Sequence, residues 1–433
     1  MPRTDAGGEG GSAGATPEPA RRGKRLSLVG WMRLLVIGVL AGATVLKFLF
    51  AANTFGTNDV RYWIMFTEAV RDYGPIGVYG HEFKWALYNH PPLTSYLLQV
   101  ISWLEFHGVG DVPFLIRVPA TLADVVTTLV VFELVRRRRG IAEATAAGVL
   151  VACSPVLIVI SGFHGNTDPV FVMFTLLSVY LLVAHRSLVT GALAGASFAA
   201  AVSVKLVPVV LLPALLLVAV RSGWRRALGF LAASGAVMAL LWGPVVLTHW
   251  SDFSENVLGY NGIAIREWGL VRFAEWFELS PAAIDFLVGP GRFIGLLLCA
   301  GLPLLLVWRR PTDLGAAAGL SLGLFLLVSP AFGFQYLVWP LAAAYLVNFW
   351  LATVYNAIAS WFVLLVYDRW NNAYPWNWDV GTAISFQSSR PYVLAVLTWQ
   401  ALAAVVVAGM LLLRRPRRGD PIDPAEESRT VLS

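Results

Sequence analysis

The stretch WMRLLVIGVLAGATVLKFLFA, residues 31–51, decides the class of fold. Its 21 residues are almost all apolar, and about 20 consecutive apolar residues are enough to cross a hydrocarbon core roughly 30 Å thick. Arg21, Arg22, Lys24 and Arg25 stand just before it, and basic residues beside a span stay on the cytoplasmic side. We therefore predict a first membrane span, retained as an anchor, that begins in the cytoplasm.

The same pattern recurs along most of the chain. Of its 433 residues, 57% are hydrophobic and 13% are charged, with a mean hydropathy of +0.67, whereas charged residues make up about a quarter of an ordinary globular protein. Further apolar blocks follow the first at 114–135, 141–160, 169–184, 188–204, 206–220, 227–247, 292–308, 314–330, 337–351, 355–367 and 392–413. The sequence thus predicts an all-α, polytopic transmembrane helix bundle of about 12 spans.

The net charge of +6 predicts an orientation rather than a nucleic-acid partner, because the basic residues lie in short clusters between the apolar blocks. Clusters at 136–139, 221–226, 309–310 and 414–418 must share the cytoplasmic side with the N-terminal tail. We expect a transmembrane domain at 31–413 in the lipid bilayer, between a disordered cytoplasmic tail at 1–30 and a cytoplasmic C-terminal tail at 414–433. No nucleic acid is expected as a partner.

This orientation requires that residues 93–106 do not cross the membrane. At 14 residues, that stretch is more typical of an interfacial or re-entrant helix than of a span. Residues 53–113 then form one long first external loop that carries amphipathic helices. The other external segments are 161–168, the turn at 204–205, 249–291, 331–336 and 368–391.

The first external loop contains a helix with one apolar side. In the run DVRYWIMFTEAVRD, residues 59–72, Val60, Trp63 and Val70 recur at helical spacing, which favours a helix lying along the membrane surface. Asn58 and Asp59 stand where this helix begins, and either suits a helix cap. Further on, the pair Pro91-Pro92 fixes the backbone and favours an extended approach to the next helix.

These features, taken in order, resemble a known family. Asp59-Val-Arg-Tyr-Trp63 and Asn89-His-Pro-Pro-Leu-Thr-Ser-Tyr96 in the first loop, Phe163-His-Gly-Asn-Thr-Asp-Pro169 after an early helix and Ser329-Pro-Ala-Phe-Gly-Phe-Gln-Tyr336 at a late boundary are similar to the C-type glycosyltransferase superfold. Within it, the chain looks like the dolichyl-phosphate-glucose-dependent glucosyltransferases of N-glycan assembly and bacterial mannosyltransferase relatives. It departs from them at His90 and at Gly165-Asn-Thr167, which leaves the sugar and the acceptor open.

The resemblance implies a reaction and a base for it. A hexose, mannose or glucose, would pass with inversion from a polyprenyl phosphate donor to a hydroxyl of a lipid-linked glycan or another acceptor on the non-cytoplasmic face. Such transfer needs a base for the acceptor proton and cations or donors for the leaving phosphate. Asp59 is the base that the resemblance implies, and we expect partial desolvation at the membrane surface to raise its pKa toward neutrality.

The substrate-binding candidates each have a structural alternative. Lys205 stands between two apolar blocks, where it either holds the phosphate or extends from a helix end to the membrane surface. His164 donates to phosphate or sugar, or is a structural residue at a helix–loop junction. Asn89 and His90 contact sugar or acceptor, or serve only the turn. The full set of substrate-binding candidates is Asn58, Asn89, His90, His164, Asn166, Asp168, Lys205, Gln335 and Tyr336.

Some aromatic and polar residues favour a structural interpretation. Tyr336 and Trp339 are typical of an aromatic belt at the membrane surface. The aromatic-rich run 367–378 would stack on sugar rings or rest at the interface. Arg117 and Asp124, seven residues apart at the start of a span, suggest an internal polar network.

Two other classes of protein compete with the enzyme. A transporter or flippase of lipid-linked sugar should place ionisable groups near the membrane midplane and often shows inverted repeats, but Lys205 is the one candidate of that kind and we see no repeat. A noncatalytic scaffold would leave the polar first loop without a purpose. We expect no cofactor and no metal, since the His, Cys and carboxylate residues are scattered. The composition favours a bacterial cell membrane, or the endoplasmic reticulum membrane in a eukaryote.

Overall fold

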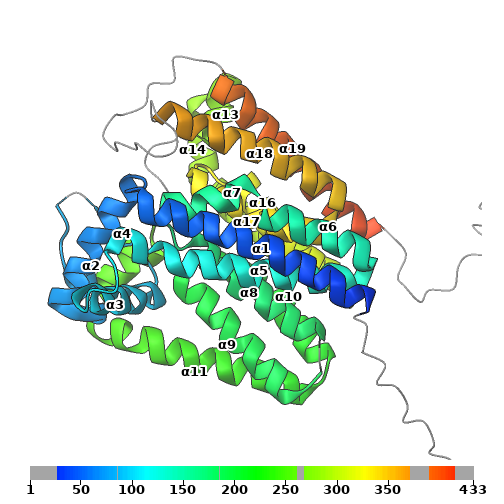
Figure 1. Cartoon of the computed structure of the whole chain (residues 1–433), viewed down its shortest axis with the longest axis horizontal. Coiled ribbons are helices and arrows are strands. Elements are labelled where there is room, and N and C mark those ends of the chain that lie inside the picture. The colour runs from blue at the N-terminus through cyan, green and yellow to red at the C-terminus, as the bar shows by residue number, and fades with distance from the viewer. Residues whose placement is uncertain (1–26, 85, 185, 261–267, 371–389, 415–433) are drawn as a thin grey trace, which may run out of the picture.

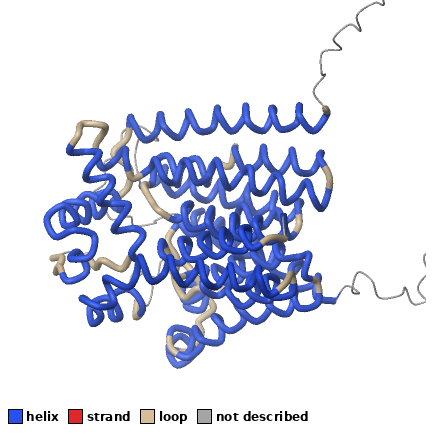
Figure 2. The backbone as a smooth tube through the Cα atoms, turned by 90° about the horizontal axis from the view of Figure 1, so that it is seen from below, coloured by secondary structure: helices blue, strands red, loops and turns tan. Residues whose placement is uncertain are grey.

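The computed structural model describes residues 27–84, 86–184, 186–260, 268–370 and 390–414. Within these ranges the chain consists of helices and connecting loops, as Figure 2 shows, which confirms the predicted all-α fold. The first half contains α1 (Leu28–Asn53), α2 (Asn58–Gly77), η1 (Val78–Gly80), α3 (Pro92–Phe106), α4 (Val112–Leu115), α5 (Arg117–Arg139), α6 (Ile141–Ala152), α7 (Pro155–Val159), η2 (Ile160–His164), α8 (Asp168–Ala184), α9 (Leu188–Val204), η3 (Val207–Leu211) and α10 (Leu212–Arg221). The second half contains α11 (Trp224–Thr248), α12 (Trp250–Phe253), η4 (Ser254–Leu258), α13 (Leu270–Trp276), α14 (Pro281–Val288), α15 (Pro290–Arg309), η5 (Pro311–Asp313), α16 (Leu314–Leu327), η6 (Phe334–Leu337), α17 (Val338–Val347), α18 (Phe349–Trp370), α19 (Arg390–Leu411) and η7 (Leu412–Arg414).

Seven helical segments in the described ranges are long and apolar enough to cross a membrane: Leu28–Asn53, Val112–Arg139, Ile141–His164, Trp224–Thr248, Pro290–Arg309, Phe349–Asp368 and Tyr392–Arg414. Five shorter apolar segments accompany them: Asp168–Ala184, Leu188–Val204, Val207–Arg221, Pro311–Leu327 and Phe334–Val347. Together they agree with the prediction of about 12 spans, and the chain is an integral, multi-pass membrane protein. Helix α3 belongs to neither group.

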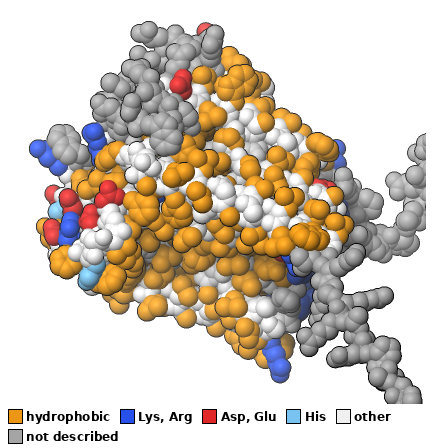
Figure 3. Space-filling view, viewed as in Figure 1, with side chains coloured by type: hydrophobic (Ala, Val, Ile, Leu, Met, Phe, Trp, Pro, Cys, Tyr) orange, Lys and Arg blue, Asp and Glu red, His pale blue; other side chains and the backbone are white. Residues whose placement is uncertain are grey.

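The long helices lie side by side and the short helices of the first loop gather at one end of them. Figure 1 places α2, α3 and α4 beyond the end of α1, opposite the end where α1 begins and α6 starts. In Figure 3 the visible face is mostly apolar, and charged and histidine side chains collect at the α2 and α3 end. That distribution is the one expected of a bundle in a bilayer with a polar loop region at one of its surfaces.

Helix α2 buries its apolar side in protein, where a helix lying on the membrane surface had been expected. Trp63, Phe66 and Val70 are buried in a hydrophobic cluster of their own, which also includes Leu98 of α3 and Val245 of α11. The Pro pair leads into α3 as predicted: Pro91 is extended, with φ −63° and ψ 162°, and Pro92 is the first helical residue. The loop helices thus form a packed platform at one end of the bundle.

Two buried polar clusters hold the first span against α5. Lys47 of α1 and Ser161 of η2 each lie 2.5 Å from the Asp124 carboxylate of α5. Arg117 donates to the carbonyls of Ala51 and Thr54 at the end of α1, at 3.0 and 2.9 Å. The single network suggested by the spacing of Arg117 and Asp124 is therefore wrong, because the two side chains belong to separate clusters that both hold α1 against α5.

Replacing Lys47 by methionine should destabilise the protein strongly. Lys47 and Asp124 are each 2% exposed, and removal of one partner of a buried ion pair leaves an uncompensated charge at a cost of about 3–5 kcal/mol. The variant Lys47→Met/Asp124→Leu, which removes both charges, should regain most of that loss. Thermal unfolding in detergent measures the stability of the single and the double variant. Equal unfolding midpoints for the wild type and Lys47→Met would contradict the expectation.

Candidate active site at the helix ends of the external loops

Asp59 lies at the beginning of α2 and faces His164. The Asp59 Oδ2 atom is 3.0 Å from Nε2 of His164, and 36% of the Asp59 side chain is exposed. Thr57, not Asp59, is the N-cap residue of α2, and its hydroxyl donates to the His164 carbonyl at 2.9 Å. The interpretation of Asp59 as a helix cap is therefore wrong, and its carboxylate remains reachable from outside.

His164 is held by the protein through both ring nitrogens. Its Nδ1 bonds the hydroxyl of Tyr367, which comes from α18, while Nε2 faces Asp59. The side chain of His164 is 4% exposed. Since both polar atoms are used inside the protein, this geometry suits a residue that orients the Asp59 carboxylate rather than one that touches phosphate or sugar.

A glycine after His164 allows α2 to approach this closely. Gly165 has a φ of 79°, in the left-handed region that favours glycine. A Cβ atom at Gly165 would lie 2.7 Å from Cγ2 of Val60, and the Trp63 indole donates to the Gly165 carbonyl at 2.8 Å. The backbone of Gly165 thus packs directly on α2 and brings Asp59 to His164.

The pKa of Asp59 is lowered, which contradicts the expected rise toward neutrality. Burial does raise the pKa of this carboxyl, but the His164 imidazole, through its charge and its hydrogen bond, lowers it by more, with smaller contributions from His90 and Lys205. The sequence indicates the desolvation of Asp59 but not the charged partners that lower its pKa, because these residues are far from it in the chain. Asp59 is consequently ionised throughout the physiological pH range.

His90 carries no charge at neutral pH. Burial and the nearby Lys205 ammonium lower the pKa of His90 to about 3, although the Asp59 carboxylate opposes them. Its ring lies 4.6 Å from that of Trp63, and Tyr79 donates to its carbonyl at 2.7 Å. His90 thus presents a neutral imidazole beside Asp59, one that donates or accepts a hydrogen bond.

Lys205 lies where α9 stops and pairs with a buried carboxylate. Its backbone is extended, with φ −154° and ψ 142°, and its Nζ atom is 2.5 Å from Oδ1 of Asp168. The ammonium also stands 4.1 Å from the ring centre of Tyr336 and 4.8 Å from that of Trp339, a cation–π geometry. Lys205 therefore points into a protein cluster, not toward the membrane surface.

Trp339 is part of the same cluster. Its indole donates to Oδ2 of Asp168 at 2.9 Å, and its ring stacks on that of Tyr336 with centres 4.2 Å apart. Trp339 is only 2% exposed. A membrane-facing aromatic belt is therefore the wrong interpretation for Trp339, which positions Asp168 and Lys205.

A cavity of about 400 Å³ adjoins these groups. It gathers side chains from segments far apart in the chain, and much of the remaining wall is aliphatic. Its polar and aromatic lining includes Asn89, His90, Lys205, Tyr260, Arg292, Tyr336 and Trp339. A pocket of mostly apolar walls with a few convergent polar groups is typical of a small-molecule site.

The middle of the chain matches a family model. Residues 89–250, which include Asn89, His90, His164 and Lys205, match the model described as "Dolichyl-phosphate-mannose-protein mannosyltransferase". The chain is a membrane glycosyltransferase of the C-type superfold. The resemblance inferred from the motifs is thus confirmed at the level of superfold and enzyme class.

This glycosyltransferase is also similar to solved structures, whereas no curated protein sequence matches it. ArnT from Cupriavidus metallidurans bound to undecaprenyl phosphate is 14% identical with a TM-score of 0.49, and the match covers 89% of this chain and 77% of that one. ArnT in the apo state is 15% identical with a TM-score of 0.43, and the match covers 92% of this chain and 62% of that one. The oligosaccharyltransferase of Archaeoglobus fulgidus in the apo form is 13% identical with a TM-score of 0.42, and the match covers 93% of this chain and 60% of that one. This chain therefore spans less than two thirds of the length of the latter two.

Six predicted site residues of the glycosyltransferase lie outside the cavity lining, and the three that take no part in the contacts described above are Asn58, Asn166 and Gln335. Asn166 is 6% exposed, and its amide oxygen accepts from the Asp168 backbone at 2.7 Å, a local turn before α8. Asn58 is exposed at the start of α2, and Gln335 is half-buried on η6 next to Gly333. Of the aromatic run at 367–378, Tyr367 reaches the site, while residues 371–378 lie outside the described residues.

The sequence reasoning missed two lining residues. Arg292 lies in the first turn of α15 and lines the cavity. In the sequence it marks only the edge of an apolar block, although an ionisable residue at the external end of a span indicates a candidate functional site. Tyr260 follows η4 and lines the cavity together with Asn89, and no motif marks it. In the described residues, no group of three or more His, Cys, Asp or Glu side chains is arranged to hold a metal ion.

Proposed function

We propose that this glycosyltransferase moves a hexose, mannose or glucose, from a polyprenyl phosphate to a hydroxyl of a lipid-linked glycan or another acceptor. The reaction takes place at the non-cytoplasmic face of a bacterial cell membrane and inverts the anomeric centre. The observation that carries the proposal is a partly exposed, ionised Asp59 oriented by His164 beside a cavity that contains Lys205. The dolichyl-phosphate-mannose donor in the name of the family model agrees with it.

The chemistry follows from the positions of these groups. Asp59 takes the proton of the acceptor hydroxyl while the oxygen of that hydroxyl forms a bond to the anomeric carbon of the sugar. The bond from the anomeric carbon to the phosphate oxygen breaks at the same time. Lys205 and Arg292, which both line the cavity, balance the negative charge on the departing lipid phosphate. His164 keeps the carboxylate aimed and ionised, since its hydrogen bond lowers the pKa of Asp59.

The sugar lies between the base and the cations. Asn89 and the neutral His90 offer hydrogen bonds to its hydroxyls, and Tyr336 offers an aromatic face. Tyr260, which lines the same cavity as Asn89, offers a further hydroxyl to the sugar. The aliphatic part of the wall suits the first isoprene units of the donor, because apolar contact there removes both surfaces from water.

Sugar transfer by the purified full-length protein in nanodiscs tests the proposal. Polyprenyl-phosphate mannose and polyprenyl-phosphate glucose, radiolabelled in the sugar, are offered separately with a membrane-lipid extract as acceptor. We expect label to move from one donor to a new product. Proteoliposomes that translocate the labelled donor without forming product would favour the flippase, and absence of both reactions would reject the polyprenyl phosphate donor.

The pH profile should remain flat on the acidic side. Because His164 and Lys205 lower the pKa of Asp59 below the usual value of about 4, the base stays ionised when the pH falls from 7 to 5. We expect kcat/KM to change by less than about twofold over that range, with the same profile for His90→Gln, since His90 is already neutral. A tenfold fall between pH 7 and 5 would show that the base has a raised pKa.

A further inference from the structure

A second, larger cavity lies at the opposite end of the bundle from Asp59. Its volume is about 1530 Å³, and it opens where α5 and α10 end and where α6 and α16 begin. This is the end that the basic clusters assign to the cytoplasm. Six arginines line it, against the two carboxylates Glu143 and Asp313: Arg137, Arg138, Arg139, Arg186, Arg221 and Arg310.

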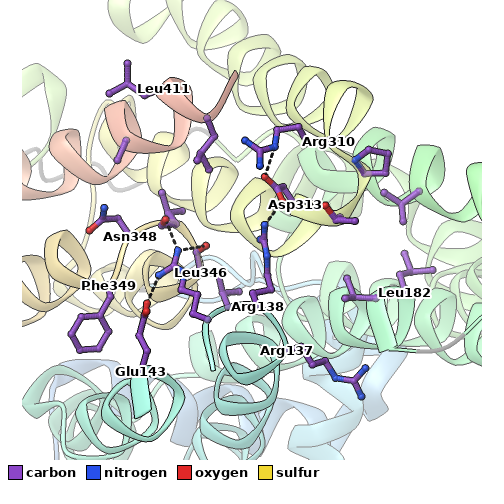
Figure 4. Close-up of a pocket in the computed structure, with 18 of the residues that line it drawn as sticks. Arg137, Arg138, Glu143, Leu182, Arg310, Asp313, Leu346, Asn348, Phe349 and Leu411 are labelled. Atoms are coloured by element: carbon purple, nitrogen blue, oxygen red, sulfur yellow. Dashed lines mark hydrogen bonds and ion pairs between the residues drawn. The ribbon is translucent and has the colours of Figure 1, made fainter. Parts of the chain in front are cut away.

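The two carboxylates neutralise only part of this charge. Asp313 pairs with Arg138 and, at 3.0 Å, with Nε of Arg310, and Figure 4 shows these two arginines converging on Asp313 while Arg137 extends away from it. Glu143 pairs with Arg139 at 2.7 Å. The Nη1 atom of Arg310 is buried with no hydrogen-bond partner among the described residues. One carboxylate thus serves two guanidinium groups, with donor capacity remaining.

The other three arginines form no ion pair within the described part of the chain. Arg221 donates to the carbonyls of Val307 and Trp308, at 3.2 and 2.6 Å, and Arg137 lies over the ring of Tyr180 at 5.5 Å. Arg186 is exposed at the start of the turn before α9. Uncompensated guanidinium groups around one cavity attract an anion, and their forked donors suit phosphate.

The apolar part of the wall indicates where that phosphate comes from. Leu182, Phe349, Trp350 and Leu411 line the same cavity, and Trp350 and Leu411 are 74% and 50% exposed, on helices that face the bilayer. A soluble phosphate would gain nothing from such a wall, whereas a phospholipid places its acyl chains on it. Basic pockets between membrane helices on the cytoplasmic side bind anionic headgroups.

We propose that this arginine-lined cavity binds the phosphate headgroup of an anionic phospholipid of the cytoplasmic leaflet. The site is separate from the sugar-transfer site and does not depend on the function proposed for it. Arg137, Arg186 and Arg221 contact the phosphate, while Arg138 and Arg310 keep the cavity open through Asp313.

Native mass spectrometry of the full-length protein released from nanodiscs tests the site. In phosphatidylcholine discs with increasing phosphatidylglycerol, we expect the wild type to retain phosphatidylglycerol. Arg137→Gln/Arg186→Gln should weaken retention by roughly tenfold or more, since each arginine that contacts the phosphate contributes about a fivefold preference for an anionic lipid. Arg137→Lys/Arg186→Lys, which keeps the charge, should retain most of it.

The matched control is Arg225→Gln/Arg414→Gln, which removes two charges at the same end from exposed arginines outside the cavity lining. We expect it to retain phosphatidylglycerol as the wild type does. Equal losses in both double variants, or no preference of the wild type for phosphatidylglycerol over phosphatidylcholine, would overturn the proposal. Displacement of the lipid by millimolar inorganic phosphate or pyrophosphate, with stabilisation by that anion in pure phosphatidylcholine discs, would also overturn it and assign the site to a soluble phosphate.

Discussion

Replacing Asp59 by asparagine is expected to lower kcat/KM for sugar transfer by about 10²–10⁴-fold, the usual contribution of a general base. Asparagine keeps the size of the side chain and an oxygen that accepts a bond from His164, 3.0 Å away in the wild type, but it takes no proton. The fold should therefore survive while the reaction fails. Initial rates in nanodiscs, with thermal unfolding as the test of folding, measure the two effects separately.

Glu68→Gln is the matched control for this substitution. Glu68 is an exposed carboxylate on the same helix α2, so the variant removes the same charge from the same element at a place remote from His164. We expect transfer within about twofold of the wild type, as for most surface substitutions. If Asp59→Asn also transfers sugar at the wild-type rate while folded, Asp59 is not the base.

Replacing Lys205 by methionine is expected to have the second largest effect. Loss of a cation that stabilises the leaving phosphate should lower kcat/KM by about 10²–10³-fold. The same change leaves Asp168, which is 1% exposed, without its ion pair, and that should destabilise the protein by about 3–5 kcal/mol. Both kcat/KM and the midpoint temperature of thermal unfolding should fall.

A second variant separates the two effects. In Lys205→Met/Asp168→Asn the buried position is neutral and still accepts the Trp339 hydrogen bond, so stability should largely return. Sugar transfer should stay low in this variant, because the leaving phosphate has lost the cation that stabilises it. Recovery of transfer together with stability would show that Lys205 only holds Asp168 in place and takes no part in the reaction.

The fold was accessible from the sequence because it follows from local patterns. Apolar blocks of span length and the position of basic clusters gave the helical bundle, its approximate span count and the exclusion of α3, since a lipid environment demands these features of each segment by itself. The same logic placed Asp59, His164 and Lys205 at one end of the bundle. The orientation of the spans alone predicts that these three residues lie at the same end, without any knowledge of how the helices pack.

The contacts inside the site were not accessible in this way. His164 and Asp59 are 105 residues apart in the chain, Trp339 and Asp168 are 171 apart, and Tyr367 and His164 are 203 apart. No periodicity links such positions, so the lowered pKa of Asp59 and the burial of Trp339 were both missed. Tyr260 and Arg292 escaped notice for the same reason, since only tertiary packing brings them to Asn89 and Lys205.

The central claim is a single displacement in which Asp59 acts as base and not as nucleophile. Of the two carboxylates described in the site, Asp168 is engaged by Lys205 and Trp339 at 2.5 and 2.9 Å, which leaves Asp59 as the one reachable carboxylate. One carboxylate with a stabilised leaving group favours direct attack and inversion, whereas retention needs a second group as covalent nucleophile.

The anomeric configuration of the first product, read by NMR against that of the polyprenyl phosphate donor, tests this claim most directly. The account predicts the opposite configuration, so that a β-linked donor yields an α-linked product. A product with the configuration of its donor would contradict it.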